Sequence, residues 1–254
     1  MYSPLRKTEL IKDELNKKHS YSLNSKLMWL IDSSIGRKLV MSVTGLFLIL
    51  FLIFHMSMNL VAIFSGEAYN TICGMLGANW YAVLGTGILA CGFVLHIVFA
   101  TILTLRNKKA RGTESYATTV KPTMVEWASQ NMFVLGLIVI IGLVLHLTHF
   151  WAKMMLPELM GVEEAYEGQF TDGAFLIQET FKNPVICIIY LLWFVAIWFH
   201  LTHGFWSAFQ TMGLDGKTWF CRLKVISNIF ATVVFLGFSA VYVGHDQCND
   251  VAHD

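Results

Sequence analysis

Five long, apolar and almost uncharged stretches constrain this chain more than any other feature. They lie at residues 39–64, 81–105, 132–151, 185–209 and 225–243. Each is long enough to cross a hydrocarbon core of about 30 Å as a helix, which takes about 20 residues. The alternative, a large soluble protein with five buried helices, would need more charge than 18 Lys and Arg and 17 Asp and Glu residues provide. The sequence therefore predicts an all-α membrane protein with five transmembrane helices, the first four forming a bundle.

Lys and Arg are distributed unevenly between these stretches. Eight lie before residue 39, none in 65–80, five in 106–126, two in 153–184, three in 210–224 and none after 243. Because cytoplasmic segments carry the excess of Lys and Arg, the N-terminus is expected in the cytoplasm and the C-terminus outside. Residues 1–35 then form a cytoplasmic segment, in which KTELIKDELNKKH predicts a charged helix. Residues 36–243 form the transmembrane domain, and 244–254 a short outer tail.

Common catalytic patterns are absent from the sequence. The five cysteines form no CxxC or CxxCH pair, so covalent haem attachment and a thiolate metal site have no support. No GxGxxG, P-loop, HExxH or GxSxG pattern occurs. The net charge of +1 carries no information about partners, and no nucleic-acid partner is expected. A self-contained catalytic site is therefore not predicted.

Histidine is the unusual residue of the apolar stretches. His19, His245 and His253 lie outside them, and the other six histidines lie within: His55, His96, His146, His149, His200 and His203. The first four stretches each hold at least one, and the fifth holds none. An ionisable side chain in hydrocarbon is costly and marks a candidate functional site by default.

Depth along each helix, at about 1.5 Å per residue, sorts four of these histidines into two levels. The first and third stretches run outward, and His55 and His146 lie near their outer ends. The second and fourth run inward, and His96 and His203 lie near their cytoplasmic ends. Two imidazoles at one depth suit axial ligation of a haem iron, which favours electron transfer over oxygen chemistry. Two such sites in a bundle would carry electrons across most of the bilayer.

Two glycines fit the same arrangement. Gly45 lies ten residues before His55, and Gly136 lies ten residues before His146. Ten residues span about 15 Å, which is close to the spacing of the two levels. Each glycine would then lie beside the inner haem, where a porphyrin edge approaches the backbone. Glycine is also common at helix contacts in membranes, which is the alternative explanation.

Two similar motifs each hold two of the histidines, HLTHFW at 146–151 and HLTHGFW at 200–206. In the first, His146 suits the outer level because His149 is already four residues from Lys153. In the second, depth alone does not choose between His200 and His203. Three roles are open to the remaining pair, His149 and His200: hydrogen bonding to haem propionates, proton transfer and packing.

The chain resembles the dihaem cytochrome b membrane subunits of bacterial succinate dehydrogenases and fumarate reductases. The resemblance covers residues 33–243 and is carried by GRKLVMSVTGLFLILFLIFHMSMN, GEAYN, FVLHIVFATILTLRN, GLIVIIGLVLHL and THGFWSAF. It implies a haem-binding bundle with axial ligands at His55, His96, His146 and His203, the last being the histidine that Gly204 follows.

The resemblance also implies the partners and the location. It implies two b-type haems, a quinone site that uses menaquinone, and a place in the respiratory chain of the bacterial cytoplasmic (inner) membrane. An iron–sulfur subunit and an FAD-containing flavoprotein would dock on the cytoplasmic face and perform the succinate or fumarate chemistry. This chain, surrounded by membrane lipid, would relay electrons between them and quinone and contribute the quinone site.

A few polar residues are candidates around these cofactors. Arg37 and Ser42 lie near the inner level, where they would meet propionates, although Arg37 is equally a topology anchor. Some family members carry intramembrane acids, but the second and fourth stretches here hold none. A proton path along them would need His200, water or propionates. Glu67 in GEAYN is the acidic candidate near an outer quinone site, and an ordinary solvated carboxylate is the alternative.

Three other functions compete with this interpretation. The nearest is a haem b, quinone-reactive anchor of a hydrogenase or formate dehydrogenase. A transporter that uses intramembrane histidines belongs to a different class, and a haem-free anchor is the third. Transporter helices are often interrupted by Gly or Pro, whereas the four prolines lie outside the five stretches: Pro4, Pro122, Pro157 and Pro184.

Overall fold

The computed structural model of the 254-residue chain describes residues 32–77, 79–111, 127–161 and 172–250, together with Lys12, Lys18 and Met28. The charged helix expected at KTELIKDELNKKH lies outside the described residues, apart from Lys12 and Lys18. So do most of the basic segment 106–126 and the last four residues of the chain.

Helices make up almost all of the described chain. Their bounds are α2 Ser34–Phe64, α3 Gly66–Met75, α4 Trp80–Arg111, α5 Trp127–Gln130, α6 Met132–His146, the π-helical turn η1 Leu147–Trp151, α7 Ala152–Met160, α8 Gly173–Phe181, α9 Pro184–Thr211 and α10 Lys217–Asp250. Five helical runs are long and apolar enough to cross a membrane: Ser34–Phe64, Trp80–Ala110, Met132–Met160, Pro184–Thr211 and Lys217–Val241. The predicted all-α, five-helix membrane fold is therefore confirmed, and the chain is an integral membrane protein.

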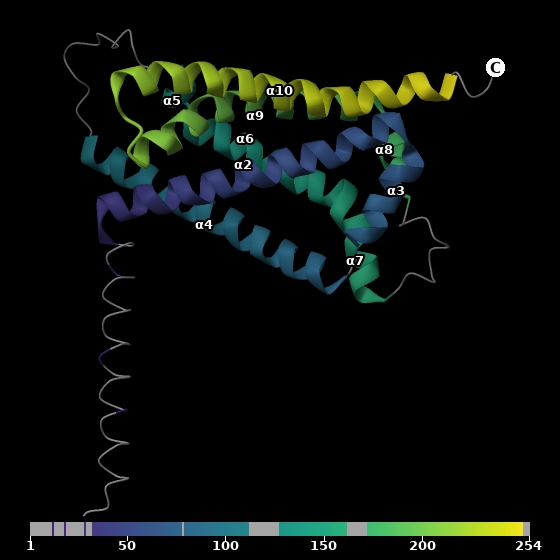
Figure 1. Cartoon of the computed structure of the whole chain (residues 1–254), viewed down its shortest axis with the longest axis horizontal. Helices are drawn as coiled ribbons and strands as arrows, with labels where there is room; N and C mark the ends of the chain where they lie inside the picture. Colours follow the sequence, from purple (N-terminus) through teal and green to yellow (C-terminus); the bar gives the residue numbers. More distant parts are fainter. Residues whose placement is uncertain are drawn as a thin grey trace, which may run out of the picture.

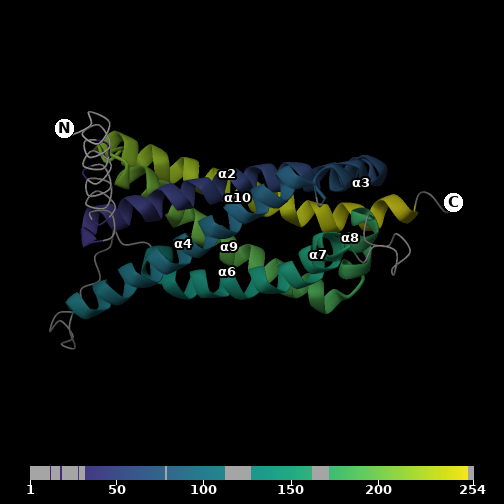
Figure 2. The same ribbon diagram turned by 90° about the horizontal axis from the view of Figure 1, so that it is seen from below.

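The four histidine-bearing helical runs pack in a closed order. Helix α2 contacts α4, α4 contacts α6, α6 contacts α9, and α9 contacts α2. Helix α10 flanks this group along α9 and α2, as Figure 1 and Figure 2 show from two sides. The intramembrane histidines therefore come from helices that surround a single interior.

Polar residues set the ends of several helices. Ser33 accepts a hydrogen bond from the Gly36 N–H at 2.8 Å, which begins α2. Ser65 ends α2 and caps α3 by accepting from Ala68. Such side-chain caps satisfy backbone donors that the first helical turn leaves unpaired. A cap of the same kind begins α8, where Asp172 accepts from the Phe175 N–H at 2.8 Å, whereas α7 continues from η1 without a side-chain cap.

The third membrane run differs in detail from its sequence-based description. The π-helical turn η1 ends at Trp151, and the helical run continues from there into α7, which contains Pro157. Figure 1 shows α7 directed away from the line of α6. π-helical turns and prolines are the usual causes of such bends. The proline therefore lies near the outer end of a continuous helical run.

Small residues allow the closest contacts inside the bundle. The Trp193 indole of α9 occupies the place that a side chain at Gly142 of α6 would take. Its Nε1 donates to the Val139 carbonyl oxygen at 3.1 Å. Ser227 of α10 is fully buried and donates to the Leu201 carbonyl oxygen at 2.9 Å. Close approach and interhelical hydrogen bonds are the terms that hold helices together in lipid.

Gly142→Ala should therefore destabilise the α6–α9 contact. The added methyl group overlaps the Trp193 indole, and overpacking of this kind costs about 1–3 kcal/mol. Thermal unfolding in detergent, followed by circular dichroism, measures the loss. The control is Gly87→Ala on α4, where a methyl group meets no described atom within 4 Å. Equal unfolding midpoints for the two variants would contradict the packing described here.

Candidate functional site

The structure brings His55 and His146 together at the outer level. Their ring centroids, one from α2 and one from the end of α6, lie 5.7 Å apart, with the ring planes nearly perpendicular. Phe51 stacks on His55 at 5.3 Å, and Trp193 lies 5.8 Å from His146. Aromatic rings from three helices therefore surround this pair.

At the inner level, the structure places His200 of α9 beside His96 of α4. Their ring centroids lie 6.5 Å apart. His203 meets Trp206 edge-on, with centroids 4.8 Å apart. His200 and His203 are three residues apart and share one side of the helix, offset by about 4.5 Å in depth. The ring geometry thus favours His200 as the neighbour of His96, whereas the resemblance favours His203.

Both ring separations fit two ligands on opposite sides of one metal. A metal–nitrogen bond of about 2 Å on each side puts the two ring centroids about 6 Å apart. The observed 5.7 and 6.5 Å lie on either side of that value. Within the described ranges, no group of three or more His, Cys, Asp or Glu residues could hold a bare metal ion. Two imidazoles at each level are the number that a haem iron accepts from a protein.

The two predicted glycines lie at the inner level. A Cβ atom on Gly45 would be 3.2 Å from Cε1 of His96, and one on Gly136 would be 3.7 Å from Cε1 of His200. Nδ1 of His200 is buried and has no hydrogen-bond partner among the residues that the structure describes. A buried polar atom of this kind usually has a ligand, water or ion as its partner. The two glycines therefore let the inner imidazoles approach the backbones of α2 and α6 closely.

Polar side chains next to two of the imidazoles were missed in the sequence analysis. Thr44 Oγ1 lies 3.2 Å from Nδ1 of His96. Asn59 Nδ2 lies 3.4 Å from Nδ1 of His55 and donates to the His55 carbonyl oxygen, while Asn59 Oδ1 accepts from the Tyr69 hydroxyl at 3.1 Å. Their position in the sequence could have identified them, since polar residues inside membrane helices usually have a partner there.

His149 pairs with a buried tyrosine. Its Nδ1 lies 3.1 Å from the Tyr190 hydroxyl, and the two rings are stacked with centroids 5.9 Å apart. Tyr190 is 2% exposed and also lies beside His146. His149 belongs to η1, and a π-helical turn in a membrane helix often marks a functional position. Of the three roles left open for His149, the structure shows a packed, hydrogen-bonded pair.

The remaining candidates lie at the two ends of the bundle. Arg37 and Ser42 are both buried near the N-terminal end of α2, and Arg37 Nη1 donates to the Asp32 carbonyl oxygen at 2.6 Å. Glu67 is exposed in the first turn of α3. A carboxylate there is favoured by the helix dipole alone, so the position of Glu67 agrees with the solvated alternative.

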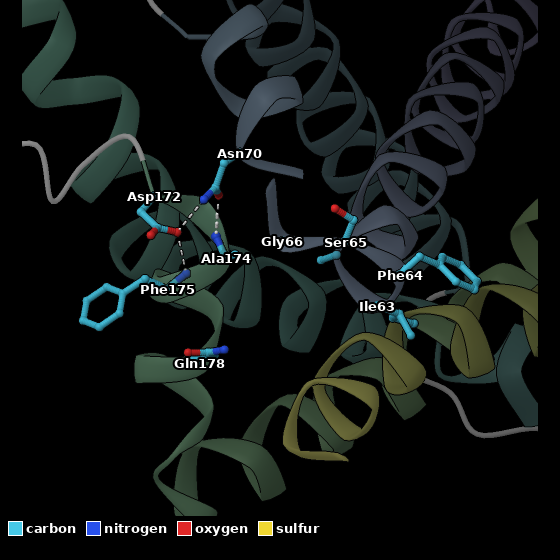
Figure 3. Close-up of a pocket in the computed structure, with 10 residues that line it drawn as sticks. Ile63, Phe64, Ser65, Gly66, Asn70, Asp172, Ala174, Phe175 and Gln178 are labelled. Atoms are coloured by element: carbon cyan, nitrogen blue, oxygen red, sulfur yellow. Dashed lines mark hydrogen bonds between the residues drawn. The ribbon is translucent and has the colours of Figure 1, made fainter. Parts of the chain in front are cut away.

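A hollow of about 390 Å³ lies at the outer end, between the end of α2 and helices α3 and α8. Its polar lining includes Asn70, whose Nδ2 donates to Asp172 Oδ1 at 2.8 Å and whose Oδ1 accepts from the Ala174 N–H at 3.0 Å. Figure 3 shows these bonds, with the Phe64 and Phe175 rings on opposite sides. Nearby, burial raises the pKa of the Tyr69 phenol. The hollow therefore has a hydrogen-bonded polar lining and an open rim, where Phe64 and Phe175 are 86% and 46% exposed.

No protein-family model, curated protein or solved structure matches the chain. The resemblance to dihaem cytochrome b proteins is therefore carried by the motifs quoted above. The proximity of His55 to His146 and of His96 to His200 is a separate observation.

Tyr190→Phe should weaken the outer end of the bundle. The variant keeps the ring but removes the hydroxyl, which leaves His149 Nδ1 without this partner. A lost buried hydrogen bond costs about 1 kcal/mol, measured as a lower unfolding temperature in detergent. Tyr81→Phe is the control, because the Tyr81 hydroxyl bonds the Met75 carbonyl oxygen at an exposed position. An effect of Tyr81→Phe as large as that of Tyr190→Phe would argue against this assignment.

Proposed function

We propose that the chain is the membrane anchor and electron-relay subunit of a succinate:quinone oxidoreductase, a succinate dehydrogenase or fumarate reductase. The observation that carries the proposal is the pairing of imidazoles from four different helices at two depths, with ring centroids 5.7 and 6.5 Å apart. Paired imidazoles buried in a membrane bundle suit electron transfer through b-type haems.

His55 and His146 are the proposed ligands of the outer haem. His96 is one ligand of the inner haem, and the other comes from HLTHGFW. The resemblance assigns it to His203, and the ring contact with His96 favours His200. Two axial imidazoles leave a haem with one-electron chemistry and no open position for oxygen. Gly45 and Gly136 let the inner imidazoles approach α2 and α6, and the buried Arg37 and Ser42 are proposed to meet the propionates of the inner haem.

Quinone is the proposed substrate of the chain itself, and menaquinone is the form that the resemblance implies. Interconversion of quinone and quinol moves two electrons and two protons, so the site must lie near both the relay and water. The outer hollow is the proposed site: its lining is partly apolar, the Asn70 amide keeps one hydrogen that could be donated to a quinone oxygen, and the Asp172 carboxylate could accept from a quinol hydroxyl. Glu67, one residue past Gly66 in its lining, is the proposed nearby acid.

The partner subunits are proposed to dock on the face that the basic segments predict to be cytoplasmic. Lys and Arg before residue 39, in 106–126 and in 210–224 predict that these segments face the cytoplasm. An iron–sulfur subunit and an FAD-containing flavoprotein would dock there and hold the succinate site. The membrane is then the bacterial cytoplasmic membrane, with the chain's N-terminus inside and its C-terminus outside.

The second candidate is a haem b anchor for a hydrogenase or formate dehydrogenase, which the same histidine geometry supports. A transporter is less well supported, because the helical runs are continuous across the bundle and Pro157 lies near the outer end. The partner proteins that co-purify with the chain distinguish the two anchors.

Haem content tests the proposal directly. The chain purified in detergent from haem-replete cells should show reduced-minus-oxidised bands of haem b and about two haems per polypeptide, since each histidine pair ligates one iron. Pyridine haemochrome analysis against protein concentration gives the ratio. A colourless preparation would point instead to transport or to a haem-free anchor.

Single histidine variants should remove the haems in pairs. His55→Ala and His146→Ala should lose the same haem, and His96→Ala should lose the other, because each haem needs both of its imidazoles. Redox titration with low-spin electron paramagnetic resonance identifies which haem is lost. His200→Ala and His203→Ala, compared side by side, decide the fourth ligand. Loss of different haems from His55→Ala and His146→Ala would refute the outer pairing.

A further inference from the structure

Thr44 places a hydroxyl group against one of the inner imidazoles. It lies on α2, directly before Gly45, and only 8% of its surface is exposed. Its Oγ1 lies 3.2 Å from Nδ1 of His96 on α4. Packing of α2 alone does not require a contact with a ring nitrogen on another helix.

The direction of this hydrogen bond follows from the other contacts of Thr44. Its hydroxyl donates to the Val40 carbonyl oxygen at 2.8 Å, and the Met41 carbonyl oxygen, at 3.1 Å, is a second acceptor. A hydroxyl group has one hydrogen and two lone pairs. Because the hydrogen is used within α2, Oγ1 can only accept from His96. The shared proton therefore belongs to Nδ1 of His96.

Gly45 shows how the ring is turned. A Cβ atom at this position would lie 3.2 Å from Cε1 and 3.7 Å from Nδ1 of His96, so this edge of the ring rests against α2. A neutral imidazole carries one N–H, and the other nitrogen keeps its lone pair for a metal. With the proton on Nδ1, the lone pair is on Nε2.

We infer that Thr44 is a positioning residue, whose hydroxyl holds His96 in the Nδ1–H tautomer and so presents Nε2 to the iron of the inner haem. The inference rests on the proposed function. Metal-bound histidines usually donate their other ring N–H to a neighbouring oxygen, which fixes the tautomer and the ring orientation. Thr44 fulfils this role from a helix that supplies no ligand to the inner haem.

Three variants separate positioning from packing. Thr44→Val keeps the branched shape but has no lone pair, and Thr44→Ser keeps the hydroxyl. Thr101→Val is the matched control on α4, because the Thr101 hydroxyl bonds only the Ile97 carbonyl oxygen of its own helix in the described structure. In the full chain purified with its haems, the readouts are haem retention at each level, the low-spin resonance of the inner haem and its midpoint potential.

Thr44→Val should weaken inner-haem binding by about 10- to 100-fold, as the loss of such a hydrogen-bonding partner does at other metal sites. The resonance and midpoint potential of the remaining inner haem should shift, and the outer haem should stay unchanged as the internal control for folding. Thr44→Ser should restore the inner haem, and Thr101→Val should leave it unaffected.

Three results would overturn the inference while leaving the proposed function standing. The first is a Thr44→Val protein with both haems and unaltered spectra. The second is equal loss of both haems, which would show a structural role. The third is a Thr44→Ser protein that behaves like Thr44→Val. An unaltered chain without haem would overturn the proposed function and this inference together.

Discussion

The hydrocarbon interior of a membrane offers no hydrogen-bond partners, and this constraint determines how the polar side chains inside the bundle are arranged. A polar group that enters the membrane must find its partner within the protein, since no water is available there. Three of the histidines have such a partner. Nδ1 of His96 lies beside a threonine hydroxyl, that of His149 beside a tyrosine hydroxyl, and that of His55 beside an asparagine amide. His200 is buried with one nitrogen unpaired among the described residues, and the proposed cofactor lies beside it.

Helix α2 is the element on which both levels depend. It carries His55 for the outer pair and contacts His96 of the inner pair through Thr44 and Gly45. Gly45 and His55 are ten residues apart, which is about 15 Å along α2. A shift of α2 along its axis would therefore disturb both pairs at once. The closed packing of α2 with α4 and α9, reinforced by α10, opposes such a shift.

The five membrane helices were predictable because charge-free runs of their length have few other folds available. The outer pair His55 and His146 was predictable from depth, since the rise per residue is constant. The choice between His200 and His203 was not, because rotation about the axis of α9 depends on packing against its neighbours. The turn η1 and the helices within the outer connections were also missed, because local caps and tertiary contacts form them.

The π-helical turn η1 makes the third membrane helix a joint between two separately oriented pieces. Such a turn accommodates one residue more than the α-helical geometry around it. Because the wide turn absorbs the extra residue, removing one residue between Leu147 and Trp151 would restore regular α-helical bonding and leave the segments on either side facing as they do now. The side chains of Met155 and Pro157 would then stay buried, and His146 would stay where it is. The part of the structure that such a deletion would change is the widened turn itself, which carries His149 against Tyr190.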